Sequence, residues 1–229
     1  MATQVRILSS MATRQLLADL VAQFQQNHAQ PITTESVGGV DAAKRVQAGE
    51  SVDMVVLAAN AIEQLLAAGK LVAGSRVDLM RSGVAVAVRA GAALPDIGSE
   101  EAVKQAVCAA KTLSYSTGPS GVQLAALFAR WGIADEIKGR IRLAPPGVPV
   151  GTLVAQGEVE MGFQQLSELM GLPGITVVGA LPPEIQITTV FSAALSVTST
   201  QADAVREVLA FMASPAADAV KRRNGMTPA

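Results

Sequence analysis

Serine, threonine and glycine residues gather where an apolar run ends near the middle of the chain. Apolar residues around Leu113 give way to a turn, and a helical pattern begins directly after it, near Val122. A helix N-terminus carries unpaired backbone N–H groups and the positive end of the helix dipole, so such a turn can bind a small anion. The candidate contacts in this turn are Ser116, Thr117, Ser120 and Gly121.

Turns of related composition occur at other places in the chain. Two follow apolar runs, and a proline-rich loop precedes a helical pattern and can present backbone N–H groups or serve only as a rigid connection. The candidate contacts there are Ser9, Ser10, Met11, Ala12, Gly38, Gly39, Val40, Gly147 and Val148. A single turn of this type can be an ordinary strand-to-helix connection. Three hydroxyl- or glycine-rich turns in one chain favour a small anion held between helix ends.

Three further residues could set which anion binds. Arg81 stands just before an apolar strand, and its guanidinium can pair a carboxylate through two parallel hydrogen bonds, which suits a polycarboxylate better than molybdate. The alternative is a surface arginine paired with Asp78. Ser82 can add a hydroxyl to the site, cap the chain locally or face solvent. Gln165 ends a strand, and side-chain alternation along a strand sends it and Gln164 to opposite faces.

The residues that could carry a proton are few. They are Glu35, Asp41, Tyr115 and Glu168, and none of them stands out as a base. A carboxylate beside a bound anion has a raised pKa because like charges repel, and such a shift suits a general base near neutral pH. The single histidine and single cysteine argue against a histidine-dependent triad, a disulfide and a multi-cysteine metal site. We therefore predict no metal and no cofactor.

The composition indicates a globular protein of 229 residues, with 50% hydrophobic and 16% charged residues, that can form one large domain or two small lobes. With 18 basic against 19 acidic residues and only 3% aromatic residues, it lacks the basic surface and stacking platforms of a nucleic-acid binder. No apolar run is long enough for membrane insertion. No signal peptide is expected, so the location is periplasmic if a leader was removed and otherwise cytoplasmic.

Strand and helix patterns alternate along the chain, which is typical of a parallel sheet with helices on both faces. The predicted strands include 5–8, 31–36, 52–58, 84–88, 112–115, 141–143, 161–164, 176–178 and 185–197. We expect an α/β protein of two lobes, each a mainly parallel sheet flanked by helices, with residues 1–81 and 192–229 in lobe 1 and 82–191 in lobe 2. Two hinge crossings, near 82–88 and 186–197, would leave a cleft at the carboxyl ends of the strands.

Several short motifs, in this order and spacing, resemble the periplasmic molybdate-binding protein family, which has a type II solute-binding fold. They are Ser9-Ser10-Met11-Ala12, Val37-Gly38-Gly39, Gly49-Glu50-Ser51-Val52-Asp53, Gly69-Lys70-Leu71-Val72 and Gly162-Phe163-Gln164-Gln165. The resemblance implies an oxyanion site in which side-chain hydroxyls assist backbone amides. Those hydroxyl positions fall here on Ala12, on Gly39 or Val40, and on Gln165, so all three hydroxyls are absent. Ser9, Ser10 and Ser120 could replace them.

A second group of motifs is similar to a branch of that family that resembles aconitate isomerase, an enzyme that shifts a proton and a double bond in a tricarboxylate. The motifs are Arg81-Ser82-Gly83-Val84, Ser120-Gly121, residues 162–169, Leu181-Pro182 and Gly225-Met226-Thr227-Pro228.

We therefore expect a monomeric solute-binding protein that holds a small anion in the cleft, an organic di- or tricarboxylate rather than a molybdate-type oxyanion, with an ABC permease as a possible partner. The alternatives are an isomerase of the aconitate type and a cytoplasmic anion sensor.

Overall fold

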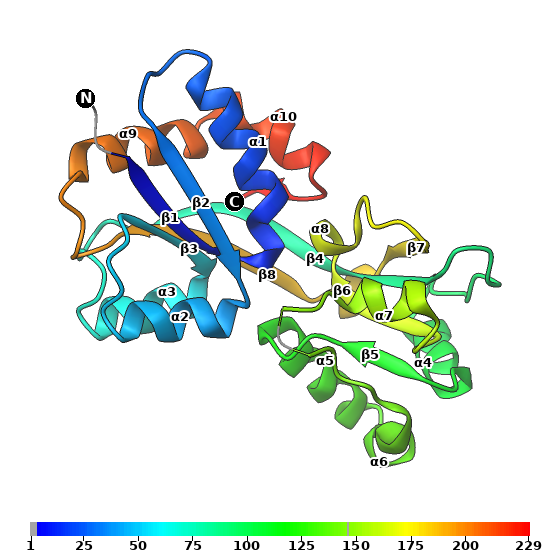
Figure 1. The fold of residues 1–229 in the computed structure, drawn as a ribbon. Coiled ribbons are helices and arrows are strands. Elements are labelled where there is room, and N and C mark those ends of the chain that lie inside the picture. The colour runs from blue at the N-terminus through cyan, green and yellow to red at the C-terminus, as the bar shows by residue number, and fades with distance from the viewer. Residues whose placement is uncertain (1–3, 146) are drawn as a thin grey trace. The chain divides into compact units, whose positions relative to one another are not determined.

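The computed structural model describes residues 4–145 and 147–229. The chain divides into two compact units, Met1–Ser82 with Val190–Ala229 and Gly83–Thr189. The chain passes from one unit to the other inside two strands, β4 (Val77–Arg89) and β8 (Thr188–Leu195). Figure 1 shows both strands among the other elements.

The first unit is built on a sheet with the strand order β2-β1-β3-β8, and β9 pairs with the start of β4. β1 runs parallel to β2 and to β3, and β8 runs antiparallel to β3. Its other strands are β1 (Val5–Ser10), β2 (Ile32–Val37), β3 (Met54–Ala58) and β9 (Thr227–Pro228). Its helices are η1 (Met11–Thr13), α1 (Arg14–Gln25), α2 (Gly39–Gln47), α3 (Ala59–Ala67), α9 (Ala202–Ala213), η4 (Pro215–Ala217) and α10 (Asp218–Arg223).

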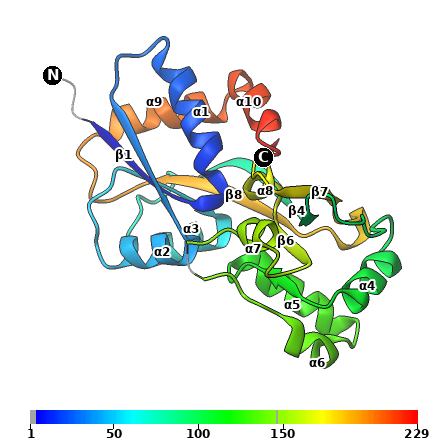
Figure 2. The same ribbon diagram turned by 45° about the vertical axis from the view of Figure 1, so that its right-hand side comes forward.

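Helices cover both faces of this sheet because its central strands are apolar on both sides. Met54 and Val56 of β3 pack into the core formed with α1 and α9, whereas Val55 and Leu57 pack into the core formed with α2 and α3. Figures 1 and 2 show α1 and α9 on one face and α2 and α3 on the other. The continuous apolar run of β3 is the pattern of a strand buried on both faces. The carboxyl ends of β1 and β2 therefore meet at one edge, where η1 and α2 begin.

The second unit has a sheet in which β4 lies between β6 and β7, and β5 pairs with β6. Its remaining strands are β5 (Leu113–Tyr115), β6 (Met161–Gln165) and β7 (Ile175–Ala180). Its helices are α4 (Glu100–Ala109), α5 (Pro119–Arg130), α6 (Ala134–Ile137), η2 (Lys138–Arg140), α7 (Val150–Gln156), α8 (Leu166–Leu169) and η3 (Pro183–Ile185). Its main core joins Phe128 of α5 to Phe163 of β6, with the ring centroids 6.1 Å apart.

The predicted α/β fold class is confirmed, but the pairing within the sheets needs correction. In the first unit β2, β1 and β3 are parallel, as expected. In the second unit β5 and β6 are parallel, whereas β4 is antiparallel to both β6 and β7. β4 crosses from the first unit into the second as one continuous strand, so its direction is set by this crossing, and it runs opposite to β6 and β7. A mainly parallel sheet is thus the wrong description of the second unit.

Two predicted strands also change. Ile141 makes a single bridge to Leu113, so 141–143 is not a strand. The strand expected over 185–197 is β8, which is shorter because η3 occupies Pro183–Ile185 and the strand ends at Leu195. Within the described ranges, no helix combines the length and apolarity needed to cross a membrane.

Candidate functional site

The first-unit turns place two hydroxyls and the start of a helix at the carboxyl ends of β1 and β2. The Ser9 hydroxyl is buried and lies 2.7 Å from the Ser36 hydroxyl of β2, so it is engaged within the sheet. The Ser10 hydroxyl is also buried, with 7% of the residue exposed, and it has no hydrogen-bond partner among the described residues. A buried hydroxyl without a partner costs about 1–3 kcal/mol, so this oxygen is available to a ligand.

The start of α2 lies next to Ser10. A Cβ atom added to Gly39 would lie 3.5 Å from the Ser10 Cβ, which measures how closely the two turns approach. Gly38 is the N-cap of α2 and gives it no side-chain cap, and the first helical hydrogen bond runs from the Ala42 N–H to the Gly38 carbonyl. The first backbone N–H groups of α2 therefore have no partner within the helix. Ser10 and the start of α2 together form a set of neutral donors, which we call the first donor set.

The other predicted contacts in this unit are backbone positions. Met11 and Ala12 lie in η1, directly after Ser10. Val40 is the second residue of α2 and is 48% exposed. Asp41 stands in the first turn of α2, where the positive end of the helix dipole stabilises a carboxylate. Its carboxylate lies near Gly38. Asp41 has therefore a structural role at the helix start.

In the second unit, the turn after β5 packs closely on the first turn of α5. The Ser116 and Ser120 hydroxyls are 3.3 Å apart. A Cβ atom at Gly121 would overlap the Ser116 carbonyl oxygen, so only glycine fits there. Thr117 is exposed, and Gly118 is the N-cap of α5 without a side-chain cap. Ser116, Ser120 and the start of α5 form the second donor set.

The two glutamines at the end of β6 point to opposite faces, as strand alternation predicts. The Gln164 Oε1 accepts the Val150 N–H at 2.9 Å. The Gln165 Nε2 donates to the Thr189 Oγ1 at 2.7 Å, while its Oε1 is buried without a partner among the described residues. Because the Thr189 hydroxyl can also donate, a half-turn of the amide would pair Oε1 with Thr189 and free the N–H groups for an anion.

Arg81 and Ser82 lie in β4 with different environments. Arg81 is exposed, and its Nη1 lies 3.5 Å from the Pro228 carbonyl oxygen. The alternative partner, Asp78, is instead engaged by Arg76, with Nε at 2.8 Å from Oδ1, and by the Ser192 hydroxyl at 2.6 Å. Ser82 is 1% exposed and its hydroxyl has no partner among the described residues, so it does not face solvent.

The predicted contacts at Gly147 and Val148 lie in the loop before α7. Gly147 has a φ of +78°, a conformation that suits glycine. The Val148 N–H donates to the Pro145 carbonyl at 3.0 Å, so this amide is already paired within the loop. A ligand would therefore meet the exposed Val148 side chain rather than its N–H group.

Sequence reasoning passed over one further buried hydroxyl. Ser114 lies in β5, is fully buried, and its Oγ has no partner among the described residues. A serine inside an otherwise apolar strand is the signal that could have identified it.

The four candidate proton carriers have different environments. The Arg45 guanidinium lies 2.6 Å from a Glu35 carboxylate oxygen and holds the pKa of Glu35 below its usual range, so Glu35 is a poor base. Burial raises the pKa of the Tyr115 hydroxyl. Burial raises the pKa of Glu168 to about 7, although a hydrogen bond with Gln164 opposes the shift. With a pKa of about 7, Glu168 can exchange a proton near neutral pH.

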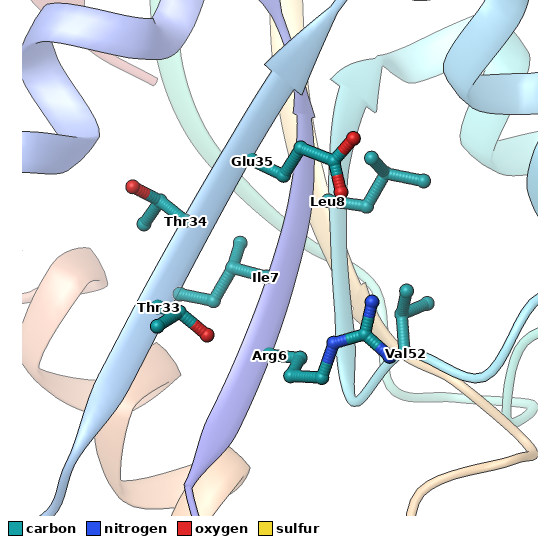
Figure 3. Close-up of a pocket in the computed structure, with 7 residues that line it drawn as sticks. All are labelled: Arg6, Ile7, Leu8, Thr33, Thr34, Glu35 and Val52. Atoms are coloured by element: carbon teal, nitrogen blue, oxygen red, sulfur yellow. The ribbon is translucent and has the colours of Figure 1, made fainter.

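A shallow pocket lies over β1 and β2 in the first unit (Figure 3). It is lined by Arg6, Ile7, Leu8, Thr33, Thr34, Glu35 and Val52. The Arg6 Nη1 donates to the Ser51 carbonyl at 2.8 Å, and Glu35 is paired with Arg45. Since its charged groups already have partners, this pocket is not the anion site. The described part of the chain also holds no group of three or more histidine, cysteine or acidic residues placed to bind a metal ion.

Comparisons with known proteins agree with this architecture. Residues 5–227 match the family described as bacterial extracellular solute-binding protein. An aconitate isomerase from Pseudomonas sp is 39% identical over 185 residues, which cover 80% of this chain and 70% of that protein. The predicted resemblance is therefore confirmed.

Solved structures show the same fold at low sequence identity. The periplasmic molybdate-binding protein of Azotobacter vinelandii superposes with a TM-score of 0.81 and 17% identity, covering 97% of this chain and 98% of that one. A sulfate-binding protein from Mycobacterium tuberculosis gives a TM-score of 0.77 and 18% identity, covering 99% of this chain and 87% of that one. The family match spans nearly the whole described sequence, and on it the chain belongs to the bacterial extracellular solute-binding proteins.

Proposed function

We propose that this protein binds a small organic anion that carries two or three carboxylates. The observation that carries the proposal is the buried Ser10 hydroxyl, which has no partner in the described part of the chain, beside the start of α2, which has no side-chain cap there. Its counterpart in the second unit is the pair of hydroxyls at the start of α5. Both donor sets offer N–H and O–H groups, which suit carboxylate oxygens, and the Asp41 carboxylate stands beside the first of them. That both sets reach the same anion, in a cleft between two lobes, stays a prediction.

Exposed valines favour an organic ligand over an inorganic oxyanion. Val40, Val122 and Val148 are 48%, 65% and 37% exposed, and each directly follows a glycine of a predicted contact turn. An apolar side chain beside a donor set gives the carbon skeleton of a polycarboxylate a surface to pack on, whereas molybdate or sulfate has no carbon to bury. Arg81 remains the candidate partner for a carboxylate, since its guanidinium is exposed and Asp78 is hydrogen-bonded to Arg76 and Ser192, although the Arg81 charge also helps to lower the pKa of Asp78.

Titration calorimetry tests this proposal. The ligands are cis- and trans-aconitate, citrate, succinate, molybdate, tungstate and sulfate. We expect a tricarboxylate to bind, and Ser10→Ala and Ser120→Ala each to weaken binding about 10- to 150-fold, as expected for the loss of one hydrogen bond to a charged group. Ser214→Ala is the matched control, because that hydroxyl donates to the Phe211 carbonyl at the end of α9. Binding of none of these anions, or equal losses in the control, would refute the assignment.

A second candidate function is an isomerase that acts on an unsaturated tricarboxylate. The specific observation behind it is the 39% identity to a protein named aconitate isomerase. An ultraviolet assay that follows interconversion of cis- and trans-aconitate tests it. Turnover that is lost in Arg81→Ala, with the circular dichroism spectrum unchanged, would support the enzyme, and tight binding without turnover would support a binding protein alone.

Location and partners follow from the family as proposals. We infer a periplasmic protein that delivers its ligand to an ABC permease if the function is transport. Cell fractionation tests the location, and recovery of the protein only in the cytoplasmic fraction would favour the alternative of a cytoplasmic anion sensor.

A further inference from the structure

We propose that the preferred ligand is a hydroxy-polycarboxylate, an anion with a hydroxyl group beside its carboxylates, and that this hydroxyl donates to the Gln165 side-chain oxygen. The proposal deepens the binding function proposed above and rests on it. The Gln165 Oε1 is buried and has no hydrogen-bond partner within residues 4–145 and 147–229. An amide oxygen only accepts hydrogen bonds, so an O–H group of a ligand satisfies it, whereas a carboxylate or molybdate oxygen does not.

Gln165 faces the same side of its sheet as the second donor set. It comes two residues after Phe163 in β6, so the two side chains lie on one face. Phe163 packs against Phe128 of α5, with the ring centroids 6.1 Å apart. Gln164 points to the other face, where its Oε1 accepts the Val150 N–H. The Gln165 amide therefore lies on the α5 face of the sheet.

The start of α5 also lies at the edge of the sheet where β6 ends. β5 and β6 are parallel, with Tyr115 opposite Phe163. Gln165 is the last residue of β6, and α5 begins at Pro119, after the turn that follows Tyr115. Groups that follow neighbouring parallel strands meet at one edge. The second donor set and the Gln165 acceptor thus share one face and one edge of the same sheet.

Thr189 fixes which end of the Gln165 amide is free. The Gln165 Nε2 donates to the Thr189 Oγ1 at 2.7 Å, and the two residues are only 4% and 8% exposed. Thr189 comes two residues after Ile187, which packs in the same core as Phe128. With Nε2 held by this hydroxyl, Oε1 is the end left for a ligand. Thr189 is thus a positioning residue, which acts on the ligand through Gln165.

The orientation of the Gln165 amide decides between two ligand preferences. With Oε1 free, an anion without a hydroxyl leaves a buried acceptor unpaired, which weakens binding about 5- to 150-fold relative to its hydroxy counterpart. The half-turned amide would present N–H groups, which any carboxylate can accept, and a hydroxyl would then add little. Two ligands that differ by one hydroxyl therefore distinguish the two orientations.

An acceptor also stands beside the first donor set. Asp41 belongs to the first turn of α2, and its Oδ2 would lie 3.2 Å from a Cβ atom added to Gly38. A ligand carboxylate placed against this side chain would be repelled, whereas a ligand hydroxyl can donate to it. Each unit, taken by itself, combines donors with an acceptor. That combination matches an anion that carries both carboxylates and a hydroxyl.

Calorimetry on the full chain compares ligands that differ by one hydroxyl: citrate with propane-1,2,3-tricarboxylate, and malate with succinate. The measurements are made at about pH 8, where the carboxyls are ionised and only the hydroxyl can donate. We expect the wild type to bind the hydroxy member of each pair about 5- to 150-fold more tightly.

Three variants assign this preference to its residues. Gln165→Met removes the acceptor at similar side-chain length. We expect it to reduce the preference to less than about 3-fold while the affinity for propane-1,2,3-tricarboxylate changes less than about 3-fold. Thr189→Val should also reduce the preference, because the amide is then free to turn. Gln105→Met is the matched control, an exposed glutamine of α4 in the same unit, and should keep the wild-type preference.

The possible failures are distinguishable. A wild type that binds these anions with a preference below about 3-fold would overturn the hydroxyl proposal and leave the binding function in place. A full preference in Gln165→Met, or an equal loss of affinity for both members of a pair, would overturn the assignment to Gln165. A full preference in Thr189→Val would overturn its positioning role. Binding of none of the anions would overturn the binding function, and the proposal with it.

Discussion

Glu168 makes the stability of the protein depend on pH in an unusual direction for a glutamate. Its folded-state pKa is about 7, above the ordinary value of 4.5, so its contribution to stability is complete below pH 4.5 and is lost as the pH rises through 7. We expect Glu168→Gln to be more stable than the wild type at pH 8 by about 1–3 kcal/mol, and the difference to vanish near pH 4. Urea unfolding at both values measures it, and a difference that does not depend on pH would contradict the burial argument.

Gly121 is constrained by the Ser116 carbonyl, which occupies the space of a Cβ atom. We expect Gly121→Ala to lower the free energy of unfolding by about 3 kcal/mol or more, because the overlap is with backbone and α5 must shift. Gly139 offers a matched control in the same unit, since nothing lies within 4 Å of an added Cβ there. Thermal melts of Gly121→Ala and Gly139→Ala that coincide would show that the close contact is absent in solution.

At the scale of elements, Arg45 of α2 connects two parts of the first unit. Its guanidinium binds Glu35 of β2 and Glu50, the residue that follows the turn after α2, each at 2.6 Å. Arg45 holds the pKa of both carboxyls below the ordinary value, so its contribution is present above about pH 4.5 and is lost as the pH falls further. The partial exposure of these side chains limits its size.

We therefore expect Arg45→Met to cost about 1 kcal/mol at pH 7 and little at pH 3, measured by urea unfolding. Arg206→Met is the control, because its partner Asp203 is fully exposed within one helix and solvent screens the pair, so we expect a smaller loss than for Arg45→Met. Equal losses in the two variants would mean that the link between α2 and β2 adds nothing beyond a surface pair.

Elements with a clear local pattern are the ones that sequence reasoning predicted. The continuous apolar run of β3 predicts a strand buried on both faces, and the apolar spacing of α1 predicts a helix with one buried face. Residues 141–143 carry a strand-like pattern but make one bridge only, since pairing depends on a partner strand elsewhere in the chain. The antiparallel course of β4 depends likewise on where its neighbours lie.

Some candidate contacts can also be predicted from local sequence, whereas others depend on tertiary packing. Turn composition alone points to Ser10, Ser120 and Gly121. That the Ser10 and Ser114 hydroxyls lack a partner among residues 4–145 and 147–229 depends on the packing of distant segments, which no local pattern predicts. The pKa of Glu168 likewise depends on burial and on Gln164, so the sequence could list this residue among the candidate proton carriers but could not rank it.

At the scale of the whole molecule, the first unit is assembled from two separated parts of the chain. β8, α9 and α10 come from the second part, and β8 pairs with β3 while α9 packs in the core with α1. We expect a fragment of residues 1–82 to show no cooperative urea transition, because β3 and α1 would lack these partners. Residues 83–189 form a continuous unit, and this fragment should unfold cooperatively. A cooperative transition in the 1–82 fragment would contradict this dependence.

The same arrangement orders the events of biosynthesis. The chain leaves the ribosome from its N-terminus. The second unit is complete once residue 189 has emerged, whereas β3 is not yet paired with β8. The edge of β3 stays open until Leu195, the last residue of β8, has been added, and the face of α1 that packs with α9 stays open longer, until Ala213 has been added at roughly 5–20 residues per second. A pause in translation just after residue 189 would lengthen that exposure, and a faster passage would shorten it.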